Sequence, residues 1–370
     1  MEFKIPEYKA PDFTSPKLAN APDCRFEAAD RDGVAPEYFH STSMFPEYFK
    51  VNGEWKLAEE SRMDSSVVLR PDGRLDVVEN RNLCKGDLVA LGRSEDGHEG
   101  IFVHTRGFED EETEIDDQFV FRQGRSRETA YSCDYDKLYE LLKHEKEHGN
   151  ILWVMGPAFA FDYDARKAMQ LLIDNGYAHG LLAGNALATH DLEAAYLGTA
   201  LGQDIYTQKS KPNGHYNHLD ICNEVRRSGS IPEFIKEHQL DDGIMCSCVK
   251  NNVPYVLAGS IRDDGPLPEV ISDVYEAASA MRNLVKDATT VICMATMLHT
   301  IATGNMTPSF RVTEDGTVRP VYLYTIDIDE FVETLAGAVS RLREMSPLWN
   351  QELDYDDIMC KKHSDTCKRC

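Results

Sequence analysis

The sequence predicts an α/β protein in which a small β-rich domain precedes a larger Rossmann-like domain built on a parallel sheet. The chain has 370 residues, of which 42% are hydrophobic, so it can bury more than one core. Short alternating stretches separated by turn signals fill residues 34–125, as in an antiparallel sheet. In residues 151–350, apolar strands alternate with helical patterns, which favours a parallel sheet covered on both faces.

The amino-terminal part divides into an arm and the β-rich domain. Residues 1–33 are rich in Pro, Asp and Ala and lack an apolar period, which predicts an extended arm with little core of its own. In residues 34–125, hairpin turns are predicted at the NG of VNGEW and the DG of RPDGRL, and strands at GDLVAL and GIFVHT. The acidic run at 109–117 is interpreted as a solvated loop.

The remaining elements follow in a regular order. A helix with one apolar face is predicted in the connecting segment 126–150. The domain at 151–350 is expected to have the strands ILWVMG, HGLLAG, VPYVLAGSI, TTVICMAT and RPVYLYTIDI. Its expected helices are DARKAMQLLIDNG, NALATHDLEAAYLG, EVISDVYEAASAMRNLV and EFVETLAGAVSRLREM. Residues 351–370 are interpreted as a tail.

Composition excludes several classes of protein. The formal net charge of -24 repels phosphate backbones and anionic lipids, so we expect no nucleic-acid partner and no membrane partner. No apolar run approaches the roughly 20 residues of a membrane helix, and the amino terminus does not resemble a signal peptide. We therefore expect a cytoplasmic protein. The scattered cysteines are interpreted as free thiols.

Polar and glycine-rich segments follow the predicted strands, where doubly wound sheets bind ligands. They include Gly156-Pro157, the AGNA that contains Asn185, and the GSIRDDGP that contains Asp264. Backbone N–H groups at the helix starts that follow would suit a pyrophosphate, and Asp327 could accept a hydrogen bond from a ribose hydroxyl and disfavour a 2′-phosphate. Because no G-x-G-x-x-G is present, the residues alone leave open a dinucleotide or another ligand.

Each of these residues also has a purely structural interpretation. Asn185 could cap a helix, and Asp264 could belong to a turn. His299 could be a core histidine. The dense polar stretch GHYNHLD favours substrate contact or helix capping over a metal, and the cysteines and histidine of the tail favour an exposed chain end. No metal site is predicted.

Several long motifs carry a family resemblance. DGVAPEYFHSTS, VNGEWKLAEESRMD, KGDLVALG, LLAGNALATHDLEAAYLGT, GHYNHLD, VKNNVPYVLAGSIRDDGPLPEVISDV and ATMLHTIATGNM resemble the archaeal-type ornithine cyclodeaminase family, also described as a lysine-oxoglutarate reductase/saccharopine dehydrogenase conserved domain. The resemblance spans residues 32–329 and implies a dinucleotide domain similar to that of deoxyhypusine synthase. It also implies that NAD is bound by Asn185, Ala186, Asp264, Thr296, Met297, Leu298, His299 and Asp327.

The chain also departs from this family pattern. The αβ segment that precedes the β domain in the family is expected to be replaced by the short arm, and no guanidine-hydrolysing domain is expected. After Asp327 the family continues through a glycine-rich stretch to another cofactor contact, whereas this chain continues into LAGAVSRLREMSPLWN. That contact and the exact substrate therefore stay open.

The resemblance implies a redox-neutral reaction that converts ornithine to proline and ammonia, with a bound dinucleotide that accepts and returns hydride. Arg262 is a candidate partner for the substrate carboxylate, with a salt bridge to a neighbouring aspartate as the alternative. Asp64, His190 and Asp191 are candidates for accepting protons or holding the δ-ammonium. The expected partners are a small amino acid and further copies of this chain. An amino-acid dehydrogenase and a non-catalytic nucleotide-binding sensor are the alternative functions.

Overall fold

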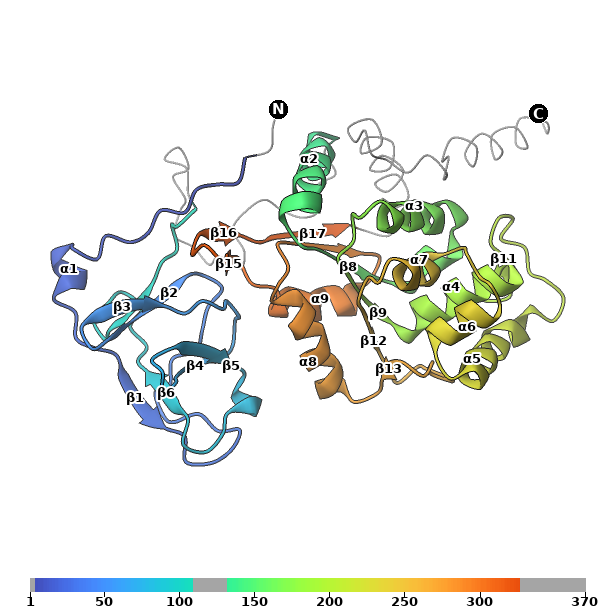
Figure 1. Cartoon of the computed structure of the whole chain (residues 1–370). Coiled ribbons are helices and arrows are strands. Elements are labelled where there is room, and N and C mark those ends of the chain that lie inside the picture. The colour runs from blue at the N-terminus through green and yellow to red at the C-terminus, as the bar shows by residue number, and fades with distance from the viewer. Residues whose placement is uncertain (1–3, 109–131, 327–370) are drawn as a thin grey trace.

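The structure is a computed structural model that describes residues 4–108 and 132–326. Figure 1 shows a β-rich part in blue and a larger part in which helices surround a sheet. The acidic run at 109–117, the helix expected after residue 326, Asp327 and the tail lie outside the described residues.

The β-rich part contains two antiparallel sheets. The first has the order β1-β6-β4-β5 and the second the order β3-β2-β7. The NG turn joins β2 to β3 with positive φ at both Asn52 and Gly53, as a two-residue hairpin turn requires, so the predicted hairpin is confirmed. The strands are β1 Arg25–Ala28, β2 Glu47–Val51, β3 Glu54–Leu57, β4 Ser66–Leu69, β5 Leu75–Val78, β6 Leu88–Leu91 and β7 Ile101–Val103.

The structure differs from the predicted extended arm at residues 1–33. This segment contains a short helix, α1 (Pro16–Ala19), and the strand β1, which pairs with β6. Cys24 is buried in the same core as Phe49 and Ile101. Because β1 is an edge strand with mostly exposed side chains, its sequence carries no apolar period, and its pairing depends on backbone hydrogen bonds.

The larger part is built on a parallel six-stranded sheet with the order β13-β12-β9-β8-β14-β17, which confirms the predicted Rossmann-like architecture. After β8 the chain adds strands on one side, and it then crosses back to place β14 on the other side. The carboxyl ends of β8 and β14 therefore form the topological switch point, where such sheets bind ligands. The strands are β8 Ile151–Met155, β9 Gly180–Gly184, β12 Tyr255–Ala258, β13 Val270–Ile271, β14 Thr290–Met294 and β17 Tyr322–Ile326.

Two predicted element boundaries are wrong. The helix expected from EVISDV begins only at Val274, because the Asp273 side chain accepts hydrogen bonds from the N–H groups of Tyr275 and Glu276 and caps it, while β13 occupies the preceding residues. The strand expected at RPVYLYTIDI is split, since Val318–Pro320 forms the separate strand β16, which pairs with β15.

Helices cover both faces of the sheet. Successive residues of β8 point to opposite faces of the sheet and therefore belong to two different cores. Trp153 packs in the core shared with α3 to α7, and Val154 packs in the core shared with α8 and α9. The helices are α2 Ser132–His148, α3 Tyr163–Asp174, α4 Asn185–Leu197, α5 Asn217–Ser228, α6 Ile231–Glu237, α7 Ile244–Lys250, α8 Val274–Val285 and α9 Met297–Met306. The short elements are η1 Asn80–Asn82, β10 Thr199–Ala200, β11 Gln203–Asp204, η2 Pro157–Phe161, η3 Gly214–Tyr216, β15 Phe310–Val312 and β16 Val318–Pro320.

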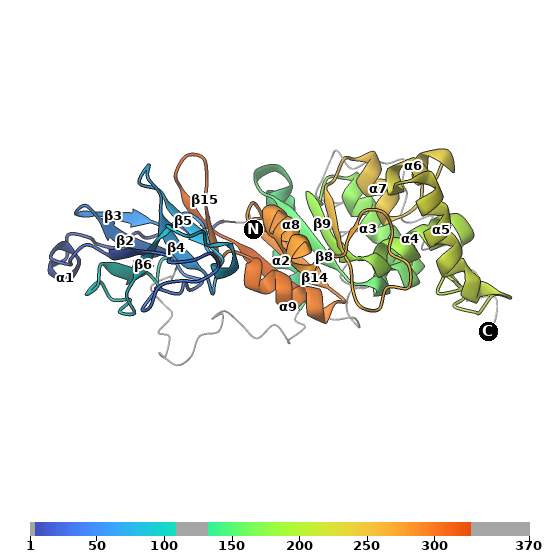
Figure 2. The ribbon, with the colours of Figure 1, turned by 90° about the horizontal axis from the view of Figure 1, so that it is seen from below.

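The β-rich part contacts the side of the sheet that α8 and α9 cover. Arg282 of α8 pairs with Glu60 at 3.1 Å, and Arg81 lies over the ring of Tyr275 at 4.9 Å. Figures 1 and 2 show α8 and α9 in orange between the β-rich part and the sheet, with α4 to α7 at the far end. Elements α4 and α5 therefore lie away from the β-rich part.

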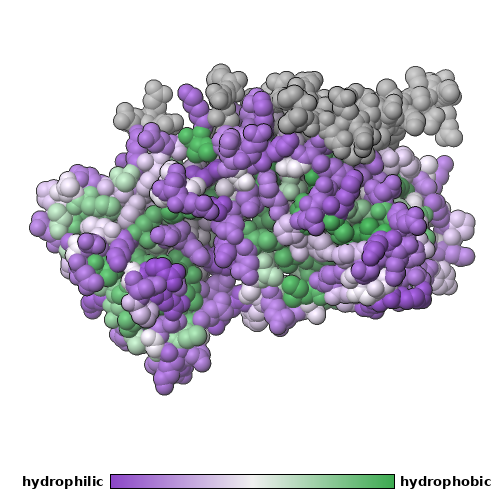
Figure 3. Space-filling model, viewed as in Figure 1, coloured by the Kyte–Doolittle hydropathy of each residue, from purple (hydrophilic) through white to green (hydrophobic). Residues whose placement is uncertain are grey.

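Hydrophilic side chains cover much of the face shown in Figure 3, in keeping with the high net charge. Within residues 4–108 and 132–326, no helix has the length and apolar character that a membrane crossing requires. Six cysteines whose side chains the structure describes are free thiols: Cys24, Cys84, Cys222, Cys246, Cys248 and Cys293.

Candidate dinucleotide and substrate site

The switch point is shaped by close backbone contacts. Gly156 follows β8, and a Cβ at this position would overlap the carbonyl oxygen of Ala295, which follows β14. Ala295 itself has a φ of 53°, which is uncommon for a residue with a side chain. Strained backbone of this kind clusters at ligand sites. Only a glycine at 156 lets these two loops meet.

The starts of α4 and α9 border the same edge of the sheet. A Cβ at Gly184, the N-cap of α4, would lie 3.1 Å from Cε1 of His299. Thr296, the N-cap of α9, makes no capping hydrogen bond through its side chain, so the first N–H groups of that helix are available to an anion. Burial lowers the pKa of His299, which keeps the imidazole neutral at pH 7.

Asn185 connects α4 to the loop after β12. Its side chain does not cap the helix, so that structural interpretation is wrong. Its Oδ1 instead accepts hydrogen bonds from the backbone N–H of Leu267 at 3.0 Å and from the hydroxyl of Thr189 at 3.3 Å. The exposed Asp264 lies in this loop, and the half-buried Ala186 follows Asn185. The structure therefore brings these three candidate cofactor residues to one edge of the sheet.

A dinucleotide fits this edge. Gly156 and Gly184 let the segments at this edge approach one another closely, and the starts of α4 and α9, neither of which has a side-chain cap, direct their N–H groups there. The backbones of Met297 and Leu298 form the first turn of α9, and their side chains lie outside the description.

We expect Asn185→Ala to weaken NAD binding by roughly tenfold and to lower the free energy of unfolding by about 1–3 kcal/mol, because the buried N–H of Leu267 loses its acceptor. Calorimetric titration with NAD and urea unfolding measure the two effects. Asn185→Asp retains an acceptor oxygen and is the matched control. Unchanged NAD affinity in a destabilised Asn185→Ala protein would assign this residue a structural role only.

Asp191, a candidate proton acceptor, lies in a buried ionic network. It has no exposed surface, and its Oδ1 lies 2.6 Å from Nε of Arg166. Its carboxylate also accepts hydrogen bonds from the N–H groups of Ile244 and Met245 at 3.0 and 2.8 Å, at the start of α7. Burial acts against the charge of Arg166, but Asp191 and Asp242 raise the pKa of its guanidinium. This geometry favours a structural role for Asp191.

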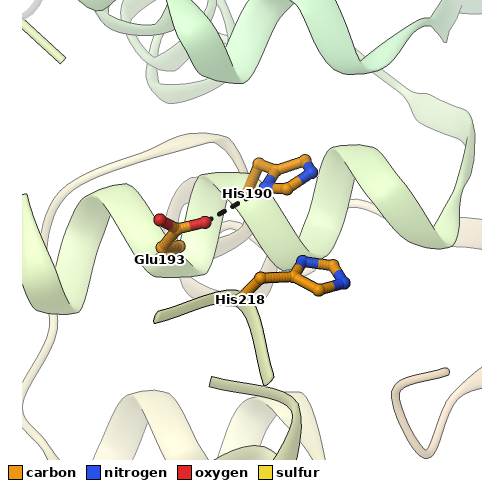
Figure 4. A group of neighbouring side chains, drawn as sticks. All are labelled: His190, Glu193 and His218. Carbon is orange, nitrogen blue, oxygen red and sulfur yellow. Dashed lines mark hydrogen bonds and ion pairs between the residues drawn. The ribbon is translucent and has the colours of Figure 1, made fainter. Parts of the chain in front are cut away.

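His190, the next residue towards the start of α4, has a different environment. Its Nδ1 lies 3.1 Å from Oε2 of Glu193, and its ring centroid lies 5.0 Å from that of His218 on α5 and 5.1 Å from that of Phe161. We call His190, Glu193 and His218 the His190 cluster (Figure 4). Their potential ligand atoms lie within 4.8 Å of one another, a spacing that could hold a metal ion.

Asp64 and Arg262 are both exposed. Asp64 lies before β4 in the β-rich part, and no hydrogen bond or ion pair among the described residues joins it to the other candidates. Arg262 lies in the loop after β12, and within residues 4–108 and 132–326 it forms no ion pair, so the alternative of a salt bridge to Asp263 or Asp264 is not observed. Arg262 is therefore available to a ligand at this edge.

Sequence reasoning missed Glu193 and Arg166 as members of buried networks. Histidine and glutamate at positions i and i+3 of one helix lie on the same face, so the spacing of His190 and Glu193 could have indicated their contact. No comparable signal links Arg166 to Asp191, because α3 and α4 come together only in the folded chain.

The parallel sheet, its switch point and the open helix starts define a Rossmann-type dinucleotide-binding protein. The chain belongs to the ornithine cyclodeaminase family. Residues 137–321 match the family model described as arginine dihydrolase ArgZ-like, C-terminal, Rossmann fold. The chain is 38% identical over 340 residues to the ornithine cyclodeaminase of Methanocaldococcus jannaschii, covering 90% of this chain and 78% of that protein. The relative from Methanopyrus kandleri is also 38% identical, over 341 residues, with the same coverage.

Solved structures agree with this membership. A conserved LOR/SDH protein from Methanococcus maripaludis superposes with a TM-score of 0.75 at 32% identity, covering 88% of this chain and 99% of that one. The ternary complex of AgrE with ornithine and NAD+ gives a TM-score of 0.51 at 26% identity, covering 88% of this chain and 47% of AgrE. The predicted family and fold class are confirmed.

Proposed function

We propose that this protein is an NAD-dependent ornithine cyclodeaminase that converts L-ornithine to L-proline and ammonia. The observation that carries the proposal is 38% identity, over 90% of the chain, to a relative named ornithine cyclodeaminase. The structure of AgrE with ornithine and NAD+ supports the choice of both ligands. An amino-acid dehydrogenase or a non-catalytic sensor is not favoured.

The cofactor would lie along the carboxyl edge of the sheet. We assign its contacts to Asn185, Ala186, Asp264, Thr296, Met297, Leu298, His299 and Asp327, the last of which lies outside the described residues. The open N–H groups of α9 support a pyrophosphate there, because a helix start favours negative charge. NAD, when bound, supplies a hydride acceptor that returns the hydride within the same reaction cycle.

The protein's own groups hold the substrate and move its protons. We assign the α-carboxylate to Arg262, whose guanidinium is exposed in the loop beside the cofactor contacts. We assign proton transfer to His190, because Asp191 is engaged by Arg166 and α7 and Asp64 lies in the β-rich part. The loops must also exclude water, since a substrate imine hydrolyses readily.

We propose that the functional unit is a homo-oligomer that acts in the cytoplasm on a small amino acid without a nucleic-acid partner. The net charge of -24 supports the last point, because it repels phosphate. We also propose a β-rich domain at 34–125, a connecting helix at 126–150, a dinucleotide domain at 151–350 and a tail at 351–370. Residues 1–33 precede the β-rich domain as an arm whose strand β1 joins its sheet.

Incubation of the purified protein with ornithine and a small amount of NAD+ tests the function. We expect proline and ammonia in equal amounts, many turnovers per NAD+ and no accumulation of NADH absorbance, because the hydride is returned. Steady formation of NADH would indicate a dehydrogenase instead. Binding of NAD without turnover of ornithine would indicate a sensor.

A further inference from the structure

Glu193 determines which nitrogen of His190 carries a proton. Oε1 of Glu193 accepts hydrogen bonds from the Thr199 hydroxyl at 2.7 Å and from the Gly202 N–H at 2.9 Å, and Oε2 accepts from the Leu201 N–H at 3.2 Å. Burial raises the pKa of Glu193, but the hydrogen bonds from His190, Gly202 and Thr199 lower it overall, so the group is a carboxylate.

An ionised carboxylate only accepts hydrogen bonds, so Nδ1 of His190 must donate across the 3.1 Å to Glu193. In a neutral ring with this tautomer, Nε2 is the nitrogen of His190 that can accept a proton. Figure 4 shows that the two imidazole rings extend in the same direction, with one nitrogen of each on the side away from the Glu193 carboxylate.

The ring of His218 lies beside that of His190, with the two ring centroids 5.0 Å apart. Burial, followed by the nearby His190, lowers the pKa of His218, which keeps the ring neutral. Its Nδ1 is buried and has no hydrogen-bond partner among the described residues. A buried polar atom without a partner is costly unless a ligand completes it. The unpartnered nitrogen of His218 beside the ring of His190 therefore suits a ligand that donates hydrogen bonds.

The negative charges around the His190 cluster favour the binding of a cationic ligand. Glu193 is ionised, and Asp263 and Asp264 lie close enough to act on His218 electrostatically. A metal ion is less suitable, because both oxygens of Glu193 are already engaged by two hydrogen bonds each. The ring of Phe161 beside His190 offers an apolar surface for methylene groups.

We propose that the His190 cluster binds the δ-ammonium group of ornithine, with His190 as the proton acceptor and Glu193 as its positioning residue; this rests on the proposed function. The δ-ammonium transfers one proton to Nε2 of His190, and Glu193 stabilises the imidazolium. The freed amine forms a C–N bond to the imine carbon. The new ring nitrogen passes its surplus proton to the α-nitrogen, and His190 adds the proton that it took. The bond from that carbon to the α-nitrogen then breaks, its electron pair leaves with ammonia, and the lone pair of the ring nitrogen forms the C=N bond of the cyclic imine.

Norvaline, which lacks the δ-amine of ornithine, is the probe that isolates this contact. Binding of both amino acids to the full chain is measured by calorimetry in the presence of NADH, which cannot accept hydride. We expect wild-type protein to prefer ornithine by roughly tenfold or more, the worth of hydrogen bonds to a charged group. The preference should disappear in Glu193→Gln and His218→Asn, whereas norvaline affinity stays unchanged.

Thr199→Val is the matched control, because it removes a hydrogen bond to Glu193 and leaves the contact with His190 in place. It should keep the preference for ornithine.

In turnover, His190→Asn should lower kcat by about 100-fold, within the range of general acid–base catalysis. If Glu193→Gln fails to fold, His218→Asn still tests the preference for ornithine over norvaline, because His218 is only half-buried.

Two results would overturn the inference. One is an undiminished preference for ornithine in both cluster variants while the wild type forms proline. The other is stoichiometric binding of Zn²⁺ to the wild type that His218→Asn abolishes, which would make the cluster a metal site. A wild type that forms no proline contradicts the proposed function instead, and its relative affinity for ornithine and norvaline still reports on the cluster.

Discussion

Replacement of Asp191 by alanine is expected to lower the free energy of unfolding by about 3–5 kcal/mol, the usual cost of removing one partner of a buried ion pair. Arg166 is 1% exposed and would lose one of its two carboxylate partners, leaving only Asp242. The N–H groups at the start of α7 would also lose their acceptor. Urea unfolding monitored by circular dichroism measures the change.

The exposed ion pair between Arg227 and Glu224 is the control for this experiment. Arg227→Ala should change stability by no more than about 1 kcal/mol, because solvent screens exposed pairs. In a double-mutant cycle, Arg166→Met combined with Asp191→Ala should cost less than the sum of the single changes. If Asp191→Ala is stable but inactive, Asp191 is catalytic and the structural role is wrong.

The sheet could be predicted from the sequence because its strands are buried on both faces. Residues 151–155 and 291–294 are apolar throughout, and such runs are typical of central parallel strands. The strand β1 could not be predicted in the same way, since its side chains are mostly exposed and its pairing with β6 uses the backbone. The two-residue strand β13 is too short to produce any pattern.

The candidate site was predictable only in part for a related reason. Residues that follow strands, such as Asn185 and Thr296, can be placed at the ligand edge from topology alone. The partners of buried charges cannot, because Arg166 and Asp191 lie on different helices whose packing is set by the whole fold. The sequence alone therefore makes both His190 and Asp191 candidate proton acceptors, although the two neighbours occupy different environments on α4.

Ornithine deuterated at the α-carbon is expected to give proline that retains the deuterium at its α-carbon. The hydride removed from the substrate has no exchangeable position on the dinucleotide and returns to the carbon it left, provided that the cyclic imine does not escape. Mass spectrometry of the proline measures retention. The same reaction with unlabelled ornithine in D₂O is the control, and it should give proline without deuterium at this carbon.

The two labelling experiments together separate a returned hydride from a released one. If the imine leaves the site and is reduced later by another NADH, the label is diluted among cofactor molecules and retention falls as unlabelled NADH is added. If the α-proton is abstracted as H⁺ instead, solvent deuterium enters proline in D₂O. Either result would contradict transient hydride transfer even with ornithine as the substrate, whereas complete retention in the presence of added NADH requires that oxidation, cyclisation and reduction occur before the intermediate can leave.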